Sequence, residues 1–328
     1  MTGENGDGFR VAPTLSLEAQ AYFRATFTKS RRDGRVIPAP DDVEGWERRS
    51  RDEIAKVEQA NEELRRRYRC EILRHDADGV GLIEIRPPRL ADGDRALVYV
   101  HGGGYVGGTA GDSMDSTLPI AVEGGLRIFS VDYTPAPRAR FPTPIEQAAT
   151  AITWLDRSGE APGGFSLYAE SAGGGLAMGA LQKLRDEGGP MPRAVALWSP
   201  WANITESGDT YLTLAEEDPQ FRYADLLAAA ARAYADPSDH AHPWVSAVHG
   251  DYSRGFPPTL IQAGTRELFL SNTVRLYRAM KDAGCLVELD LYEGMWHAFH
   301  FQPIDMPEAR LARANSLTFI ERHWVAPG

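Results

Sequence analysis

Ser171 stands in the sequence Ala-Glu-Ser-Ala-Gly, between an apolar run of strand length, FSLYAES, and a helical stretch, AGGGLAMGALQKLRDEG. A tight turn from a strand into a helix exposes a serine hydroxyl at the carboxyl edge of a sheet. The start of the helix also favours negative charge nearby. The pattern indicates a nucleophile, although a serine between small residues can also simply ease the packing of a helix on a strand.

A glycine run, His101-Gly102-Gly103-Gly104, follows the strand-like segment ALVYV. Its consecutive N–H groups, with no side chains in the way, can point at an oxyanion. A rival interpretation comes from Gly102, Gly104 and Gly107, which spell the G-x-G-x-x-G of a dinucleotide site, with Asp132 ending the next strand. Against it, the loop does not open directly into a helix, and the helix-like stretch that follows contains Pro119. A purely structural glycine turn also stays open.

A serine nucleophile needs a base and an acid that orients the base. In α/β-hydrolases the acid precedes the histidine, and both follow the serine. His297 and His300 lie after the late strand LVELDLYEG, and His297 is the predicted base, with His300 a pocket wall or surface group. The acid should follow the strand TLIQAG, where Glu267 is the carboxylate that the sequence offers. A surface glutamate beside Arg266 is the alternative.

Strand-length and helical segments alternate from Gly79 onward. This alternation predicts an α/β fold with a mostly parallel sheet covered on both faces and helical segments as a lid. Together with the serine, glycine and histidine motifs above, it indicates an α/β-hydrolase fold. Two helices are expected before it, from Leu15 to about Thr28 and from Trp46 to about Tyr68. The predicted division is an N-terminal helical part of a lid (1–70), a catalytic core (71–202 and 253–328) and a lid insertion (203–252).

Composition narrows the classes of partner. A net charge of −11 over 328 residues argues against nucleic acid and anionic membranes. No apolar run approaches the roughly 20 residues of a membrane span, and the start has no secretory pattern. We therefore expect a cytoplasmic protein that acts on a small-molecule ester. The sequence leaves the oligomeric state open, a homodimer included.

Other reactive residue types point to packing rather than chemistry. Cys70 and Cys285 are too few for a disulfide framework and are expected as buried thiols. The histidines of the insertion match no common metal pattern, so no metal and no cofactor are expected; they are His240, His242 and His249. Aromatic residues near the motifs are candidates for substrate binding, with core packing as the alternative; they are Tyr105, Trp201, Trp296 and Trp244.

Taken together, these segments resemble the hormone-sensitive-lipase-like family of bacterial carboxylesterases over roughly residues 70–325. The resemblance rests on His101-Gly102-Gly103-Gly104-Tyr105, Asp132-Tyr133-Thr134-Pro135-Ala136-Pro137 with Phe141-Pro142, Ser199-Pro200-Trp201, and Tyr292-Glu293-Gly294-Met295-Trp296-His297. It implies Ser171 as nucleophile, Glu267 as acid and His297 as base. It further implies an oxyanion hole made by the N–H groups of Gly103, Gly104 and Ala172, and a cofactor-free esterase for short acyl chains.

The sequence departs from the family pattern in three places. Ala169 replaces the first glycine of the G-x-S-x-G turn, and Glu170 replaces the usual aspartate or threonine. Thr134 and Arg138 replace an arginine and a glutamate that form an ion pair in the second block. None of these changes removes a catalytic group. An acyltransferase or amidase with the same triad, and a non-catalytic receptor on this scaffold, remain the alternative functions.

Overall fold

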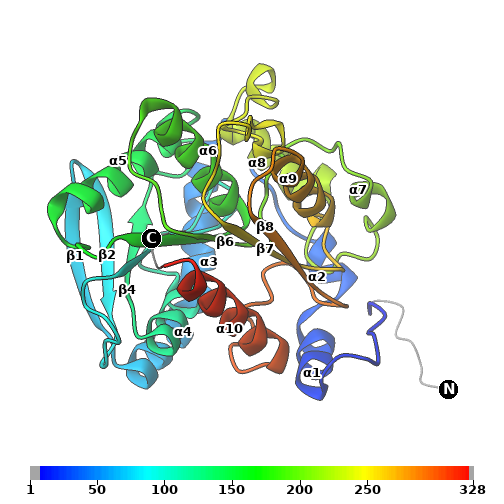
Figure 1. The fold of residues 1–328 in the computed structure, drawn as a ribbon. Coiled ribbons are helices and arrows are strands. Elements are labelled where there is room, and N and C mark those ends of the chain that lie inside the picture. The colour runs from blue at the N-terminus through cyan, green and yellow to red at the C-terminus, as the bar shows by residue number, and fades with distance from the viewer. Residues whose placement is uncertain (1–7, 325–328) are drawn as a thin grey trace.

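The computed structural model describes residues 8–324, and an eight-stranded sheet lies at its centre (Figure 1). The strands are β1 (Glu71–Ala77), β2 (Val80–Arg86), β3 (Ala96–Val100), β4 (Arg127–Asp132), β5 (Phe165–Glu170), β6 (Val195–Trp198), β7 (Thr259–Gly264) and β8 (Val287–Tyr292). They lie in the order β1-β2-β4-β3-β5-β6-β7-β8. β2 is antiparallel to both of its neighbours, and the pairs from β4 to β8 are parallel. The prediction of an α/β-hydrolase fold is confirmed.

Helices cover both faces of the sheet. On one face lie α5 (Thr143–Ser158), α6 (Ser171–Glu187) and α9 (Leu270–Asp282), and on the other α4 (Met114–Gly124) and α10 (Pro307–Arg322). Every residue of β3, β6 and β7 is buried, as is typical of parallel strands enclosed from both sides. The two resulting cores fix the strand ends from which the site residues project.

Some elements differ from the sequence-based expectation. The first strand, β1, was not predicted, because its sequence EILRHDA buries only Ala77 fully at the edge of the sheet and so lacks a regular apolar pattern. Helix α5 was also missed. Helix α4 forms despite Pro119, and it starts at Met114, well after the glycine run. The glycine loop therefore does not open a helix, as a dinucleotide-binding turn would.

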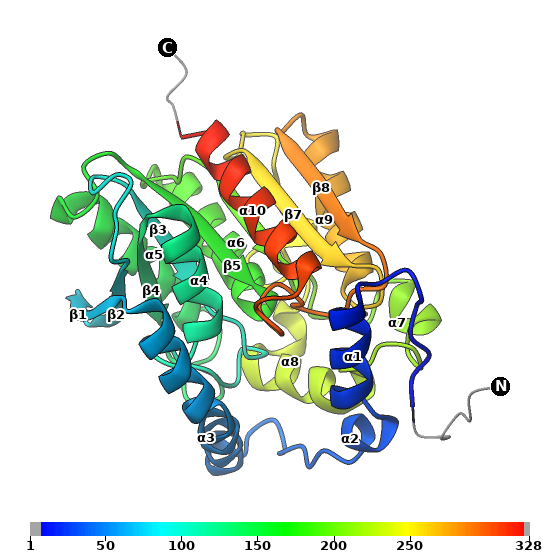
Figure 2. The ribbon, with the colours of Figure 1, turned by 90° about the horizontal axis from the view of Figure 1, so that it is seen from below.

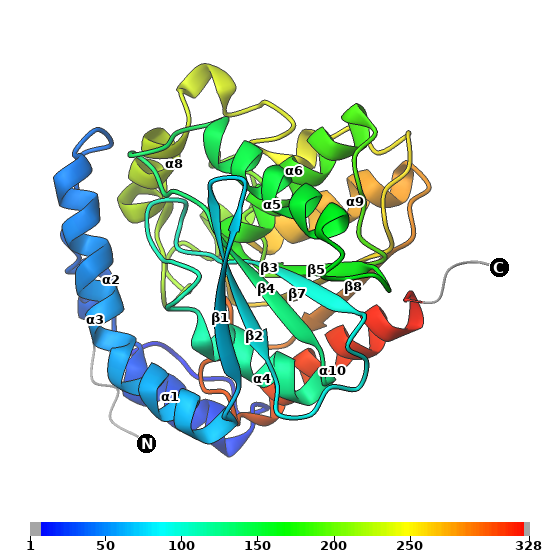
Figure 3. The same ribbon diagram turned by 90° about the vertical axis from the view of Figure 1, so that its left-hand side faces the viewer.

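The segments predicted as a lid lie around one end of the sheet. The N-terminal helices are α1 (Leu17–Thr26), α2 (Lys29–Asp33) and α3 (Val43–Tyr68). The insertion holds α7 (Thr210–Thr213), an irregular turn (Tyr223–Leu227), α8 (Ala228–Tyr234) and two short 3-10 turns (Pro237–Asp239 and Ala247–His249). Figure 2 shows α1, α2, α3 and α8 on the same side of the molecule, and Figure 3 shows α3 running along one flank. Residues 1–7 of the predicted N-terminal part and 325–328 of the predicted core lie outside the described residues.

Within residues 8–324, no helix combines the length and the apolar character needed to cross a membrane.

Candidate active site

Ser171 occupies the sharp turn that the sequence predicts. It follows β5 directly, begins α6, and has a φ of 52°, a conformation that residues other than glycine adopt rarely. Gly173 makes the turn possible, because a Cβ there would lie 2.2 Å from the carbonyl oxygen of Val100. Ala169 is fully buried in the core beside the turn, so its extra methyl group is accommodated. The serine hydroxyl is thereby held at the carboxyl end of a central strand.

His297 joins Ser171 to Glu267. Its Nε2 lies 2.9 Å from Ser171 Oγ, and its Nδ1 lies 2.7 Å from Glu267 Oε2. The imidazole is nearly buried, and the rings of Phe221 and Phe269 stand edge-to-face against it at 5.2 and 4.9 Å. Three residues predicted from separate motifs thus form one hydrogen-bonded chain. In this arrangement a proton on Nδ1 faces the carboxylate, which leaves Nε2 free to accept the serine proton.

The Glu267 carboxylate is fully buried, so its other oxygen also needs partners. Oε1 accepts hydrogen bonds from Ser199 Oγ at 2.9 Å and from the Gly264 N–H at 2.9 Å. The Ser199 hydroxyl in turn accepts the Ala298 N–H at 3.0 Å. Ser199 therefore ties the acid to the loop that carries His297. In the sequence, Ser199 stands out only as part of the Ser199-Pro200-Trp201 segment, which by itself indicates no role.

The glycine loop lies beside the serine. Gly103 has a φ of 105°, and a Cβ there would lie 2.1 Å from the Gly107 carbonyl oxygen, so only glycine fits. Among residues 8–324, the N–H groups of Gly103 and Gly104 have no hydrogen-bond acceptor. Ala172 is the second residue of α6, where a backbone N–H has no partner within the helix. These three donors are available for an oxyanion.

Two aromatic side chains shape the start of this loop. The Tyr133 hydroxyl donates to the carbonyl oxygens of His101 and Gly102 at 3.0 and 3.2 Å. The His101 ring stacks on Tyr133 with the centroids 4.2 Å apart. Burial lowers the pKa of His101, so its imidazole stays neutral and serves as a structural group. The conformation of the glycine loop thus depends on Tyr133.

Glu170 lies between the glycine loop and the serine. Its Oε1 accepts the Gly102 N–H at 3.1 Å and the Tyr99 hydroxyl at 3.3 Å. Burial raises the pKa of Glu170 to about 7, with the charge of Asp115 adding to the effect. This carboxyl group therefore changes its charge near neutral pH, directly beside the candidate nucleophile.

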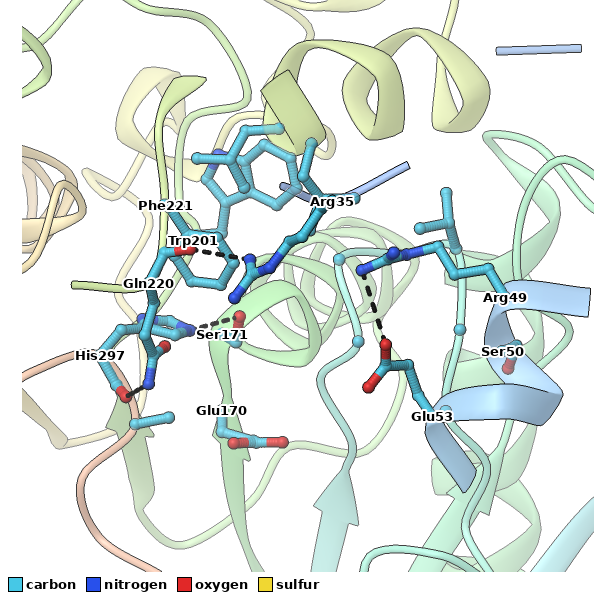
Figure 4. Close-up of a pocket in the computed structure, with 18 of the residues that line it drawn as sticks. Arg35, Arg49, Ser50, Glu53, Glu170, Ser171, Trp201, Gln220, Phe221 and His297 are labelled. Carbon is cyan, nitrogen blue, oxygen red and sulfur yellow. Dashed lines mark hydrogen bonds and ion pairs between the residues drawn. The ribbon is translucent and has the colours of Figure 1, made fainter. Parts of the chain in front are cut away.

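A cavity of about 350 Å³ opens above Ser171 and His297. Trp201, Phe269 and Leu227 provide apolar wall on one side, and Trp46 and Ser50 of α3 contribute from the other. Figure 4 shows that Arg35 and Arg49 also reach into this space from the N-terminal part. Both predicted lid segments thus contribute residues to the pocket. Of the predicted substrate-binding residues, Trp201 lies in the wall.

Two other assignments need correction. Tyr105 is buried beneath the pocket, where its ring stacks on Tyr234 at 4.0 Å and its hydroxyl donates to the Trp201 carbonyl. Trp296 points the opposite way from His297, into a cluster with Phe23 and Phe27. Neither side chain lines the cavity. The physical reason is packing, because each ring gains more buried contact among other aromatic rings than it would at a solvated wall.

His300, Cys70 and Cys285 do not line the cavity above Ser171. His300, predicted as a pocket wall or surface group, is fully buried and stacks on Trp198 at 4.7 Å. Cys70 and Cys285 are free and half-buried, and burial raises the pKa of both thiols. Within residues 8–324, no three His, Cys, Asp or Glu side chains lie close enough to hold a metal ion.

Thr134 and Arg138, two positions where the sequence departs from the family pattern, contact other residues. Thr134 exchanges two hydrogen bonds with Gln147 of α5, through its N–H at 2.8 Å and its hydroxyl at 3.1 Å. Arg138 forms an ion pair with Glu47 of α3. The ion pair that is usual in the family is thus replaced by a neutral hydrogen-bonded pair and by an ion pair with α3.

Comparison with known proteins identifies the family. The α/β-hydrolase-fold family matches residues 97–301, more than half of the chain. The acetyl-hydrolase of Streptomyces hygroscopicus is 36% identical over 228 residues, which cover 70% of this chain and 75% of that protein. The carboxylesterase NlhH of Mycobacterium tuberculosis is 28% identical over 75% of this chain and 80% of its own length.

Solved structures agree. An esterase of the bacterial hormone-sensitive lipase family is 32% identical, with a TM-score of 0.73 over 78% of this chain and 85% of that one. The chain belongs to the hormone-sensitive-lipase-like α/β-hydrolases. A second esterase of this fold, E25, superimposes over 96% of this chain and 98% of its own with a TM-score of 0.85, at 26% identity. Membership of this family of esterases confirms the prediction of a carboxylic ester hydrolase.

Proposed function

We propose that this chain is a serine carboxylesterase that hydrolyses small or short-acyl esters through an acyl-enzyme. The observation that carries the proposal is the hydrogen-bonded chain from Ser171 through His297 to Glu267. The cavity of about 350 Å³ supports a small substrate, because it lies near the lower end of the usual range for ligand pockets. The similarity to an acetyl-hydrolase supports a short acyl group.

In the proposed mechanism, Ser171 Oγ attacks the ester carbonyl carbon while His297 Nε2 takes its proton. The carbonyl oxygen becomes an oxyanion and accepts hydrogen bonds from the N–H groups of Gly103, Gly104 and Ala172. His297 then gives the proton to the leaving alcohol as the C–O bond breaks, which leaves the acyl group on Ser171. Water, activated by His297, attacks this acyl-enzyme and releases the carboxylic acid.

Glu267 has an orienting role in this proposal. Its buried carboxylate holds the Nδ1 proton of His297 and stabilises the imidazolium that forms during each half-reaction. Ser199 and the Gly264 N–H keep the carboxylate in place through its second oxygen. The N-terminal helices and the insertion are proposed to form a lid, since both provide residues of the cavity wall.

The test is hydrolysis of para-nitrophenyl acetate by the wild-type chain and by Ser171→Ala. We expect the variant to lose activity by about a thousandfold or more, because the covalent route is removed. A fluorophosphonate should label Ser171 in the wild type, and mass spectrometry should locate the adduct. The exposed Ser253→Ala serves as the matched control. Wild-type-like turnover by Ser171→Ala, or no labelling of Ser171, would contradict the proposal.

A further inference from the structure

Two arginine side chains line the cavity. An enzyme that hydrolyses only neutral esters needs no cationic side chain at this place. Arg35 follows α2, and Arg49 lies on the second turn of α3. Both belong to the wall of the cavity that contains Ser171 and His297. Figure 4 shows both guanidinium groups pointing into the cavity that Ser171 also lines. The chain as a whole carries a net charge of −11, so two cations at this place stand out.

The Arg35 guanidinium lacks a carboxylate partner. Its Nη1 donates to the Gln220 carbonyl oxygen at 2.8 Å, and its central carbon lies 5.8 Å from the centre of the Phe221 ring. Among the ion pairs of residues 8–324, none involves Arg35. A guanidinium has five N–H donors, so the carbonyl bond leaves most of them available to a ligand. Arg35 is an exposed residue, and the Gln220 carbonyl is its hydrogen-bond partner among residues 8–324.

Arg49 is only loosely paired. Its Nη2 lies 4.0 Å from Glu53 Oε1, and its Nη1 lies 3.5 Å from the Val36 carbonyl oxygen. Both contacts are long and therefore weak. Because such exposed ion pairs contribute little, a ligand anion could displace Glu53 at small cost. Arg49 can therefore turn toward a negative group in the cavity.

The local electrostatics favour an anion near the two guanidinium groups. Burial, followed by repulsion from the neighbouring Arg49 cation, lowers the pKa of Arg35, whereas the charges of Glu53 and Asp218 raise it. A bound anion would relieve that repulsion. Glu170, the carboxyl group nearest the nucleophile, has its pKa raised to about 7 by burial, so it opposes an anionic substrate less than an ordinary glutamate would.

We propose that Arg35, assisted by Arg49, binds a negatively charged group of the substrate, and that the natural ester carries a carboxylate, phosphate or comparable anion. This inference rests on the proposed function and adds a substrate class to it. The guanidinium geometry suits such groups, because paired N–H donors match two oxygens of one carboxylate or phosphate. A purely structural role for Arg35, as a clamp between the N-terminal part and Gln220, is the alternative that the test must separate.

The test compares matched ester pairs that differ only in charge. In one pair the charge is in the leaving group, para-acetoxybenzoate against para-acetoxybenzamide. In the other pair the charge is in the acyl group: monoethyl adipate is compared with the ethyl ester in which a methyl ketone replaces the free carboxylate. The measured quantity is the ratio of kcat/KM for the charged ester to that for its neutral partner. We expect a ratio above one in the wild type for at least one pair, falling as salt is added.

Arg35→Gln should lower this ratio about tenfold, since a charge-assisted hydrogen bond is lost. Arg35→Lys should retain part of it, and Arg49→Gln should cause a smaller decrease. Arg48→Gln is the matched control, because Arg48 is a neighbour on α3 that lies outside this cavity. A structural clamp would instead lower both members of each pair together and leave the ratio unchanged.

The outcomes separate the two proposals. Ser171-dependent hydrolysis of the neutral esters, with a ratio of one or less in both pairs, would overturn the anion site and leave the esterase intact. A ratio above one that neither Arg35→Gln nor Arg49→Gln changes would also overturn it. If neither member of any pair is hydrolysed and Ser171 is not labelled, the proposed function fails, and this inference fails with it.

Discussion

At the scale of single residues, the site combines a strained serine with two carboxyl groups in different surroundings. Ser171 has a φ of 52°, which the sheet and α6 on either side impose. Glu267 is surrounded by donors from three residues. Glu170 has the Gly102 N–H and the Tyr99 hydroxyl, and burial raises its pKa to about 7. The two carboxyl groups of the site thus differ in their hydrogen-bond donors.

The raised pKa of Glu170 has a consequence for stability. Between about pH 4.5 and 7 the folded chain keeps a proton on Glu170 that the unfolded chain has released. The contribution of this group to stability therefore falls as the pH rises through that window. Glu170→Gln resembles the neutral form, so we expect its free energy of unfolding to rise by about 2.5 kcal/mol relative to that of the wild type as the pH increases from 5 to 8.

Urea denaturation of both proteins at several pH values from 5 to 8 measures this difference in the free energy of unfolding. Comparison with the wild type removes the contributions of other titrating groups, such as Asp218 and Asp115. If the difference in the free energy of unfolding does not change with pH over this range, the pKa of Glu170 is not raised.

At the scale of elements, the insertion is fastened to the loop that carries the acid. Asp218 is fully buried; its Oδ1 accepts the N–H groups of Gln220 and Phe221, and its Oδ2 accepts the Leu268 N–H at 2.7 Å. Gln220 in turn donates to the His297 carbonyl oxygen at 3.3 Å. Asp218 is therefore a main anchor of the segment that bears Phe221 against His297.

Asp218→Asn should loosen this connection. The amide can replace only one carboxylate oxygen as an acceptor, so one buried N–H loses its partner, at a cost of about 1–3 kcal/mol. We expect a lower free energy of unfolding and a lower kcat/KM for para-nitrophenyl acetate, because Phe221 no longer holds the imidazole firmly. Asp225→Asn, an exposed position in the same insertion, is the control. Equal behaviour of the two variants would show that Asp218 does not anchor the insertion.

At the scale of the whole molecule, the N-terminal segment packs against the last part of the chain. Phe9, Leu15 and Phe23 share an aromatic cluster with Trp296 and Phe299, which flank His297 in sequence. Helix α1 also contacts α10. The N-terminal part therefore supports the histidine loop from behind, while α3 lines the cavity from the front.

Phe23→Ala tests this support. Phe23 is 1% exposed and touches Phe27 and Trp296 with ring centres 5.2 and 5.6 Å apart. We expect the substitution to lower the free energy of unfolding by about 3–5 kcal/mol, because it leaves a cavity in an aromatic cluster. Leu17→Ala on the same helix, where the side chain is 81% exposed, should change it by less than about 0.5 kcal/mol. Similar effects of the two variants in thermal or urea denaturation would contradict the supporting role of α1.

The family, the fold class and the three hydrogen-bonded residues were all predictable from the amino-acid sequence. Ser171 directly follows β5, Glu267 and His297 lie in the loops after β7 and β8, and the carboxyl ends of these parallel strands meet at one edge of the sheet. Local pattern and a general rule of sheet topology were therefore sufficient. The edge strand β1 lacked such a pattern and was missed.

The side chains that surround Ser171, His297 and Glu267 could be identified only from the three-dimensional structure. Trp296 precedes His297 yet turns away from the cavity, whereas Arg35 and Phe221 reach the cavity from distant segments. The support of Glu267 by Ser199 likewise joins residues 68 positions apart. Such contacts depend on how loops and helices pack and on the direction in which each side chain leaves its backbone. A local pattern of residue types does not contain that information, because it arises only when distant parts of the chain meet.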